Sequence, residues 1–259
     1  MKEGSKTEYR APAVSKALDI IEFLCVQDEP LTKKEIAEAL GKTVNEIFRM
    51  LEELKRRNYV VHDVKSGKYW LSMKLYQIAN HHRPIERLTR ACAVYLKRLA
   101  QETQQSCHVT VFDSNKMLVI AQSFSPYMMG FGVKIGAQID VHASGSGLVY
   151  LSSCTDDEVE RLLTLGNMAS NEKDQIKSAL IEVRDKTFYI GASEVVPGVT
   201  DLSFPVYSVN RQLEAVLTVP YLKMDHLSLQ HYFPSIEESR ASVASYALKI
   251  SESLGFIVE

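Results

Sequence analysis

The stretch that decides the fold of the first third of the chain runs from residue 32 to residue 71 and reads TKKEIAEALGKTVNEIFRMLEELKRRNYVVHDVKSGKYWL. Two capping-box signatures punctuate it, each a Thr followed three residues later by a Glu: Thr32 with Glu35, and Thr43 with Glu46. Each signature opens an amphipathic run, which predicts helices over residues 33–40 and 44–57. Gly41 lies between them, where a helix end favours glycine. The stretch therefore predicts a helix-turn-helix.

The segments on either side complete this motif. Apolar residues spaced three, four and seven apart over residues 14–26 predict a preceding helix. After the helix-turn-helix, the β-rich runs 59–61 and 69–71 enclose a turn at residues 65–68, which is the signal of a β-hairpin. Three helices followed directly by a hairpin predict a winged helix.

The start of the helix over residues 44–57 is expected to face DNA bases. In such motifs the first residues of the recognition helix reach the base edges, where Asn pairs with adenine and Arg with guanine. Basic side chains further along contact phosphates, which position the protein without reading sequence. The candidate DNA-binding residues are Thr43, Asn45, Glu46, Arg49, Lys55, Arg57, Lys65 and Lys68. The alternatives are a solvated helix face with ordinary Lys–Glu pairs, and a winged helix that binds protein.

The rest of the chain differs in charge. The 259 residues are 46% hydrophobic and 24% charged, as in globular proteins of one large or two modest domains. Residues 1–83 hold 15 Lys and Arg against 12 Asp and Glu, a net +3, and residues 84–259 hold 15 against 20, a net −5. With the helix-breaking Pro84, this predicts domains over residues 1–72 and 84–259 and a linker helix over residues 73–83.

The second half mixes predicted strands and helices. Strands are expected at 107–112, 117–121, 130–135, 188–195, 199–207 and 212–219, and helices at 85–104, within 140–153, and at 156–165, 172–186 and 229–254. Hairpins interrupted by a helical block predict an α+β domain with an antiparallel sheet.

Several functions are not expected. The four cysteines form no C-x-x-C pair, and no cluster has metal-ligand spacing, so we expect neither a metal nor another cofactor. The chain contains no run of about 18 apolar residues and no secretory leader, which predicts a cytoplasmic protein without membrane contact. The residues around Ser146 lack the G-x-S-x-G pattern of a hydrolase nucleophile.

Several segments, in this order along the chain, resemble the IclR-type bacterial transcriptional regulators. They are AVSKALDII at 13–21, RML at 49–51 with Leu54, YV at 59–60, DVHASGSG at 140–147, and VPGV at 196–199 followed by FPV at 204–206. The resemblance implies a winged helix-turn-helix, a linker helix and a GAF-like effector domain, assembled as a homodimer or tetramer. It implies a regulator rather than an enzyme, with operator DNA and a small organic effector as partners. The alternative is an enzyme or small-molecule sensor whose winged helix serves as a protein-interaction module.

The resemblance also implies an effector pocket. The positions that correspond to the family's pocket are Phe131, Ile139, Gly145, Ser146, Asp201 and Thr218. Backbone N–H groups of the 142–147 loop would hold an acidic or carbonyl end of the ligand, or else this loop is a plain helix cap. Three positions depart from the family pattern: Asp201 replaces a common Cys, Pro220 a Ser and Gly191 an Asp. These departures argue against a small 2-oxo acid, and Asp201 would pair with a cationic or hydroxylated effector or face solvent.

Overall fold

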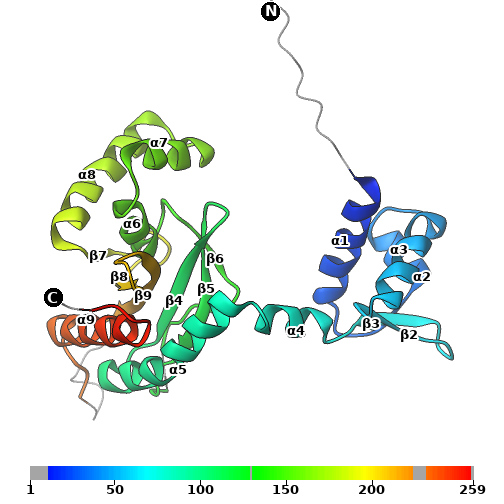
Figure 1. Ribbon diagram of the computed structural model, residues 1–259, viewed down its shortest axis with the longest axis horizontal. Coiled ribbons are helices and arrows are strands. Elements are labelled where there is room, and N and C mark those ends of the chain that lie inside the picture. The colour runs from blue at the N-terminus through cyan, green and yellow to red at the C-terminus, as the bar shows by residue number, and fades with distance from the viewer. Residues whose placement is uncertain (1–10, 129, 224–231, 258–259) are drawn as a thin grey trace, which may run out of the picture. The chain divides into compact units, whose positions relative to one another are not determined.

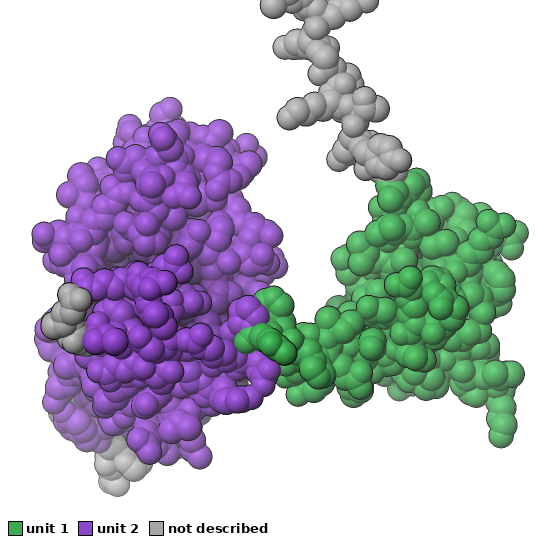
Figure 2. All heavy atoms as spheres, in the orientation of Figure 1, with its two compact units in different colours: residues 1–83 green, residues 84–259 purple. Residues whose placement is uncertain are grey.

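The structure, a computed structural model, describes residues 11–128, 130–223 and 232–257. The chain divides into two compact units, residues 1–83 and residues 84–259 (Figure 2). No helix in the described part of the chain is long and apolar enough to cross a membrane.

The first unit is a winged helix (Figure 1). Its elements are α1 (Pro12–Cys25), β1 (Leu31–Thr32), α2 (Lys33–Ala39), α3 (Val44–Arg56), β2 (Val60–Asp63), β3 (Lys68–Leu71) and α4 (Lys74–Asn80). Both capping boxes are present, and Gly41 adopts a φ of +61°, as the sequence predicted. The two-residue strand β1 was not predicted. It adds to the hairpin to give the sheet order β1-β3-β2.

The core and the wing of this unit follow from a few side chains. Ile20, Ile36 and Ile47 bring one fully buried residue from each of the three helices into a common core. In the wing, the carboxylate of Asp63 accepts hydrogen bonds from the backbone N–H groups of Lys65, at 3.1 Å, and Ser66, at 3.0 Å. The carboxylate therefore fixes the turn that carries the exposed tip of the wing.

The second unit is built on a six-stranded antiparallel sheet. Its strands are β4 (Cys107–Asp113), β5 (Lys116–Ser123), β6 (Gln138–Asp140), β7 (Tyr189–Ala192), β8 (Val199–Tyr207) and β9 (Leu213–Leu222), in the order β6-β5-β4-β9-β8-β7. Its helices are α5 (Arg83–Thr103), α6 (Gly145–Ser152), α7 (Asp156–Leu165), α8 (Ser170–Lys186) and α9 (Ile236–Ser253). The predicted α+β fold with an antiparallel sheet is confirmed.

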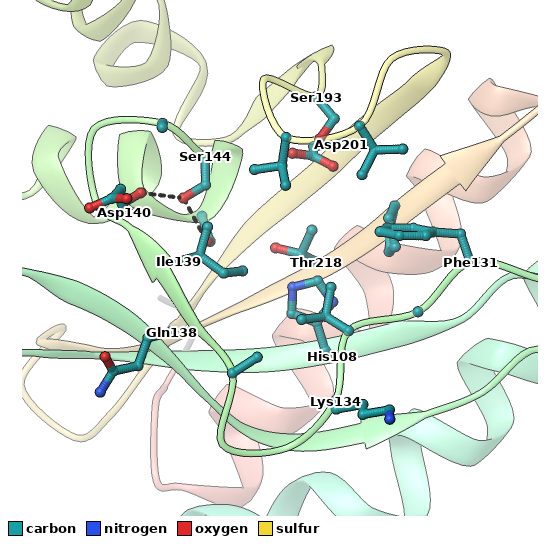
Figure 3. A pocket seen from close by; sticks show the side chains of 18 residues that line it. His108, Phe131, Lys134, Gln138, Ile139, Asp140, Ser144, Ser193, Asp201 and Thr218 are labelled. Atoms are coloured by element: carbon teal, nitrogen blue, oxygen red, sulfur yellow. Dashed lines mark hydrogen bonds between the residues drawn. The ribbon is translucent and has the colours of Figure 1, made fainter.

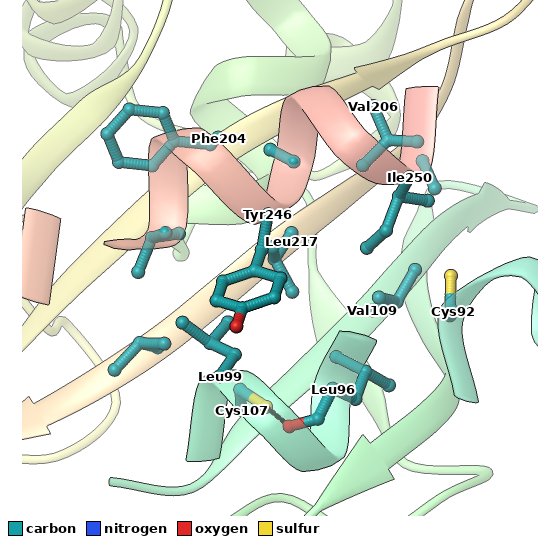
Figure 4. Packing of buried hydrophobic residues seen from close by; sticks show 14 of the residues in the cluster. Cys92, Leu96, Leu99, Cys107, Val109, Phe204, Val206, Leu217, Tyr246 and Ile250 are labelled. Carbon is teal, nitrogen blue, oxygen red and sulfur yellow. Dashed lines mark hydrogen bonds between the residues drawn. The ribbon is translucent and has the colours of Figure 1, made fainter. Parts of the chain in front are cut away.

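Side-chain alternation gives the sheet two different faces. One face packs on α5 and α9 and is apolar, as Figure 4 shows for Val109, Leu217 and Ile250. The other face meets α6, and α7 and α8 join the second apolar cluster there. On this second face the middle strands carry the buried polar residues His108, Thr110, Asp201, Ser203 and Thr218. The site described below lies on that polar face.

Two predicted elements were wrong. Residues 130–135 form no strand, and the short strand β6 pairs with the edge of β5 instead. Phe131 and Val133 of this segment line a cavity rather than pack in a sheet. The last helix was predicted to begin at residue 229, but it begins at Ile236, because Pro234 precedes it and Ser235 is its N-cap. Residues 229–231 lie outside the described part of the chain.

Candidate functional site

A cavity of about 540 Å³ lies against the polar face of the six-stranded sheet (Figure 3). Five of the six residues predicted for the effector pocket line it: Phe131, Ile139, Ser146, Asp201 and Thr218. The sixth, Gly145, is buried and does not line it. The cavity thus brings together residues that lie up to 87 positions apart in the chain.

A row of polar side chains crosses the sheet at the cavity, and two of its members, His108 and Thr218, line the cavity. In the sheet register Thr218 stands opposite Ser203 on one side and opposite His108 on the other. The hydroxyls of Ser203 and Thr218 form a hydrogen bond of 2.9 Å, with either as the donor. A hydroxyl has one hydrogen to donate and two lone pairs, so Thr218 keeps capacity for a ligand.

Asp201 occupies the place where the sequence predicted the acidic end of a ligand. Its side chain is buried, with 8% of the residue exposed, at the start of α6. Burial raises the pKa of this carboxyl, while hydrogen bonds from the Gly145 N–H and the Ser193 side chain act in the opposite direction. The Gly147 N–H donates to the side chain of Ser144 at 3.0 Å. The Gly147 N–H, which was expected to bind a ligand, is therefore partnered within the chain, and the Gly145 N–H acts on the Asp201 carboxyl.

His108 was not among the predicted site residues. It lines the cavity, is only 4% exposed, and its buried Nδ1 has no hydrogen-bond partner among the described residues. Burial lowers the pKa of His108 to about 4, so the imidazole is neutral at physiological pH. The only sequence signal was its position in the strand: the side chain of residue 108 alternates with the core residues Cys107 and Val109.

Two glycines make room for an aromatic ring next to this site. A Cβ on Gly145 would approach the ring of Tyr189 to 2.5 Å, and a Cβ on Gly191 would meet the Tyr189 hydroxyl at 2.3 Å. Real Cβ atoms are not found so close to other atoms. The space that a side chain at Gly191 would need is therefore occupied by Tyr189. The family pattern has an Asp at this position.

Apolar side chains close the remaining walls. They come from the segment before β6, from β6 itself and from the loop after β7, and include Phe131, Val133, Ile139, Val195 and Val196. Apolar walls around a few convergent polar groups are typical of small-molecule pockets. The loop after β7 was predicted as strand through residue 195, whereas β7 ends at Ala192.

The predicted DNA-binding residues differ in how far their polar groups are already used within the chain. Asn45 and Arg49 are exposed on α3, and Lys65 is exposed in the wing. Thr43 and Glu46 instead form the capping box of α3, with the Thr43 N–H donating to Glu46 at 2.8 Å. Their polar atoms therefore serve first to start the helix.

Intramolecular ion pairs hold three residues of this surface. The Glu46 carboxylate accepts a 3.0 Å bond from Lys16, and its pKa is lowered to about 2 by the Thr43 backbone and by Lys16. Lys55 pairs with Glu52 at 2.6 Å, and Arg57 pairs with Glu53 at 2.6 Å. Within the described residues, Arg49 and Lys65 form no ion pair. Lys68, on β3, lies near Glu35 and lowers the pKa of that carboxyl as the smallest of its causes.

Phe48 is a further residue that sequence reasoning missed on this surface. It lies on α3 beside Arg49, is 44% exposed, and has the Lys33 ammonium 4.8 Å from its ring centre. Its spacing from Val44 and Leu51 along the helix is that of an apolar-face residue, which predicts burial rather than exposure. No group of three or more His, Cys, Asp or Glu that could hold a metal is found in the described part of the chain.

Comparison with known proteins agrees with both units. The sequence matches the IclR helix-turn-helix domain over residues 13–64 and the bacterial transcriptional regulator IclR C-terminal family over residues 84–251. It is 22% identical over 254 residues to the HTH-type transcriptional regulator XynR of Escherichia coli (strain K12), covering 94% of this chain and 97% of the relative. It is 23% identical over 252 residues to KdgR of the same organism, covering 94% and 93%.

The solved structures show the same fold. An IclR homolog from Microbacterium hydrocarbonoxydans, complexed with 4-hydroxybenzoate, aligns with a TM-score of 0.76 at 16% identity, over 94% of this chain and 99% of that one. The matching families and relatives are regulators, not enzymes. The chain therefore belongs to the IclR family of bacterial transcriptional regulators, as a DNA-binding regulator with a C-terminal ligand-binding domain.

Proposed function

We propose that this regulator binds a pseudo-palindromic operator through residues 1–72, and that a small organic effector bound in residues 84–259 changes its affinity for that operator. Residues 73–83 would link the two. The cavity carries this proposal: it places buried polar groups with spare hydrogen-bonding capacity between apolar walls, as a ligand site requires. The effector would be a metabolite of a catabolic pathway, and the assembly a cytoplasmic homodimer or tetramer.

The exposed residues of α3 and the wing would contact DNA in different ways. Asn45 and Arg49 would read bases, since their side chains are exposed at the start of the recognition helix. Lys65 and Lys68 would contact phosphates. Lys55 and Arg57 would do so only by exchanging their present partners Glu52 and Glu53 for phosphate groups. Thr43 and Glu46 would position the helix through its capping box.

An electrophoretic shift with the upstream intergenic DNA at two salt concentrations tests this assignment. Arg49→Ala should weaken operator binding by about 1–3 kcal/mol and relax specificity at one base pair. Lys65→Ala should weaken all sequences alike and reduce the salt slope by about one. Lys177→Ala, in the second unit, is the matched control and should change neither. Native affinity in Arg49→Ala would show that the base-reading residues lie elsewhere.

The assembly can be measured separately. Two recognition helices must reach half-sites about one turn of DNA apart, roughly 34 Å, so one copy of the winged helix is insufficient for tight binding. Sedimentation at micromolar concentration should show a dimer or a larger species. A monomer at that concentration would exclude the two-helix operator arrangement.

Effector control has a thermodynamic test that does not depend on its sign. A compound that weakens operator binding must itself bind the DNA complex less tightly, by the same factor. The 4-hydroxybenzoate complex of the Microbacterium homolog supports small organic compounds as the class to screen. Calorimetric titration of each compound that binds, with and without operator, should give matching ratios. Ligand binding that leaves operator affinity unchanged would contradict effector control.

A further inference from the structure

The start of α6 already faces a carboxyl group that belongs to the protein. Asp201, near the start of β8, lines the cavity together with Ser144 and Ser146 of that helix start, and the Gly145 N–H counteracts the burial that raises the pKa of this carboxyl. The N-terminus of a helix attracts one negative group because its N–H groups lack helical partners. Since Asp201 supplies that group, a ligand carboxylate placed there would be the second one.

The cavity offers little positive charge to balance a second anion. Among the described lining residues, Lys134 is the one Lys or Arg, and it is exposed. Asp140, which also lines the cavity, is paired with Lys116. Two like charges in a partly desolvated site repel strongly. An acidic ligand group next to Asp201 is therefore disfavoured.

The surroundings of the Asp201 carboxyl also argue against a cationic ligand. The Gly145 N–H and the Ser193 side chain offset part of the burial that raises the pKa of Asp201, so a counter-ion would compensate only the remaining part. A cation would lose its own hydration on entering the cavity, and this cost offsets much of the attraction in a buried ion pair. A neutral donor avoids that cost and still finds an acceptor in Asp201.

His108 indicates that a ligand would need a second hydrogen-bonding group, away from Asp201. His108 lines the same cavity beside Thr218 (Figure 3), is 96% covered, and its buried Nδ1 has no hydrogen-bond partner among the described residues. A buried nitrogen without a partner is unfavourable, and a ligand could satisfy it. A neutral imidazole carries one donor and one acceptor, and a hydroxyl can serve either.

We propose that the effector is a small, uncharged, hydroxyl-bearing organic compound, with one hydroxyl donating to Asp201 and a second polar group meeting His108 and Thr218. This rests on the proposed effector site and narrows its ligand class. Asp201 then acts as the residue that excludes acids from the start of α6. The apolar walls would cover the carbon frame between the two polar ends.

Calorimetry on the full-length protein without DNA can compare three matched compounds. The compounds are 4-hydroxybenzyl alcohol, 4-hydroxybenzoate and 4-hydroxybenzylamine, which differ only in one head group. The native protein should bind the alcohol at least tenfold more tightly than either charged compound. Asp201→Asn should reduce the preference for alcohol over acid by tenfold or more, whereas Glu194→Gln, which removes an exposed carboxylate, should keep it. Tighter binding of the acid or the amine by the native protein would overturn the proposal.

Acetate tests the anion position without any effector. Asp201→Ala removes the carboxylate, so acetate should fill the start of α6 and raise the melting temperature by about 3 °C at ten times its Kd. The native protein and Asp201→Asn should not respond when chloride at equal ionic strength is the reference. Equal stabilisation of the native protein, or no response of Asp201→Ala, would overturn the role of Asp201. Operator binding by the native protein is measured separately, so either failure leaves the proposed DNA-binding function standing.

Discussion

The two faces of the six-stranded sheet are equally buried but have different chemistry. Along β9, Leu217 and Val219 point to the face covered by α5 and α9, while Thr218 points to the cavity. The exposed fractions of Leu217 and Thr218 are 0% and 3%. Burial alone therefore does not separate core from site. The two faces differ because the polar face contains buried atoms that can still form hydrogen bonds. In a hydrophobic core, buried polar atoms already have their hydrogen-bond partners.

The two faces should respond differently to substitution, and the apolar face should show the largest loss of stability. Leu217→Ala should lower the free energy of unfolding of the second unit by about 2–5 kcal/mol, because the surrounding side chains cannot refill the cavity. Trp70, the one tryptophan of the chain, lies in the first unit. Circular dichroism should therefore show the shift, while the Trp70 fluorescence transition stays in place. A loss below 1 kcal/mol would mean that this face is not tightly packed.

The buried imidazole of the polar face should make stability depend on pH. The pKa of His108 is lowered by burial to about 4 in the folded protein, from 6.5. Between these values the unfolded chain takes up a proton and the folded chain does not, so stability is present above pH 6.5 and is lost as pH falls toward 4. The loss should reach about 3 kcal/mol.

A variant isolates this contribution. His108→Gln should remove that part of the pH dependence in urea unfolding at pH 7 and pH 4.5, and His82→Gln, at an exposed histidine, should not. A pH profile that is the same in native protein and His108→Gln would show that the imidazole is protonated or solvated in the folded state.

Removing one hydroxyl of the polar row should cost less stability than removing a core side chain. Thr218→Val keeps the shape but takes away the partner of the Ser203 hydroxyl at 2.9 Å. We expect a loss of about 1 kcal/mol in unfolding free energy. Effector binding should weaken more than stability, since Thr218 lines the cavity. A variant with native ligand affinity would place the ligand away from Thr218.

Local patterns predicted the winged helix well because its signals act over a few residues. The capping boxes at Thr32 and Thr43 and the turn at Gly41 each need only neighbours three or four residues away, and the structure contains all of them. The segment 130–135 was misjudged because its apolar residues look the same whether they fill a sheet or line a cavity. Only the pairing of β5 with β6 decides between these arrangements.

Only part of the site was predictable, because its contacts join segments that are far apart in the sequence. The resemblance placed Ser146, Asp201 and Thr218 together, but it could not show that the Gly145 N–H meets the Asp201 carboxylate, which depends on how β8 lies against α6. His108 carries no local signal beyond strand alternation. Its importance follows from an orphaned nitrogen that only three-dimensional packing can reveal.

The smallest expected effect on stability concerns Asp201, whose desolvation is partly offset by its donors. Burial raises its pKa above the ordinary 3.8, so the folded protein holds a proton that the unfolded chain releases first. This contribution is fully present below pH 3.8 and is lost as pH rises through the raised pKa. Asp201→Asn removes the titration, so the variant should gain stability relative to native protein as pH rises through that window. Melting curves of both proteins, each with its second-unit transition followed by circular dichroism, measure the difference. A difference in stability between the two proteins that stays constant with pH would mean that the helix start fully compensates the buried charge of Asp201. The selectivity against acids would then rest on repulsion between the two carboxylates alone.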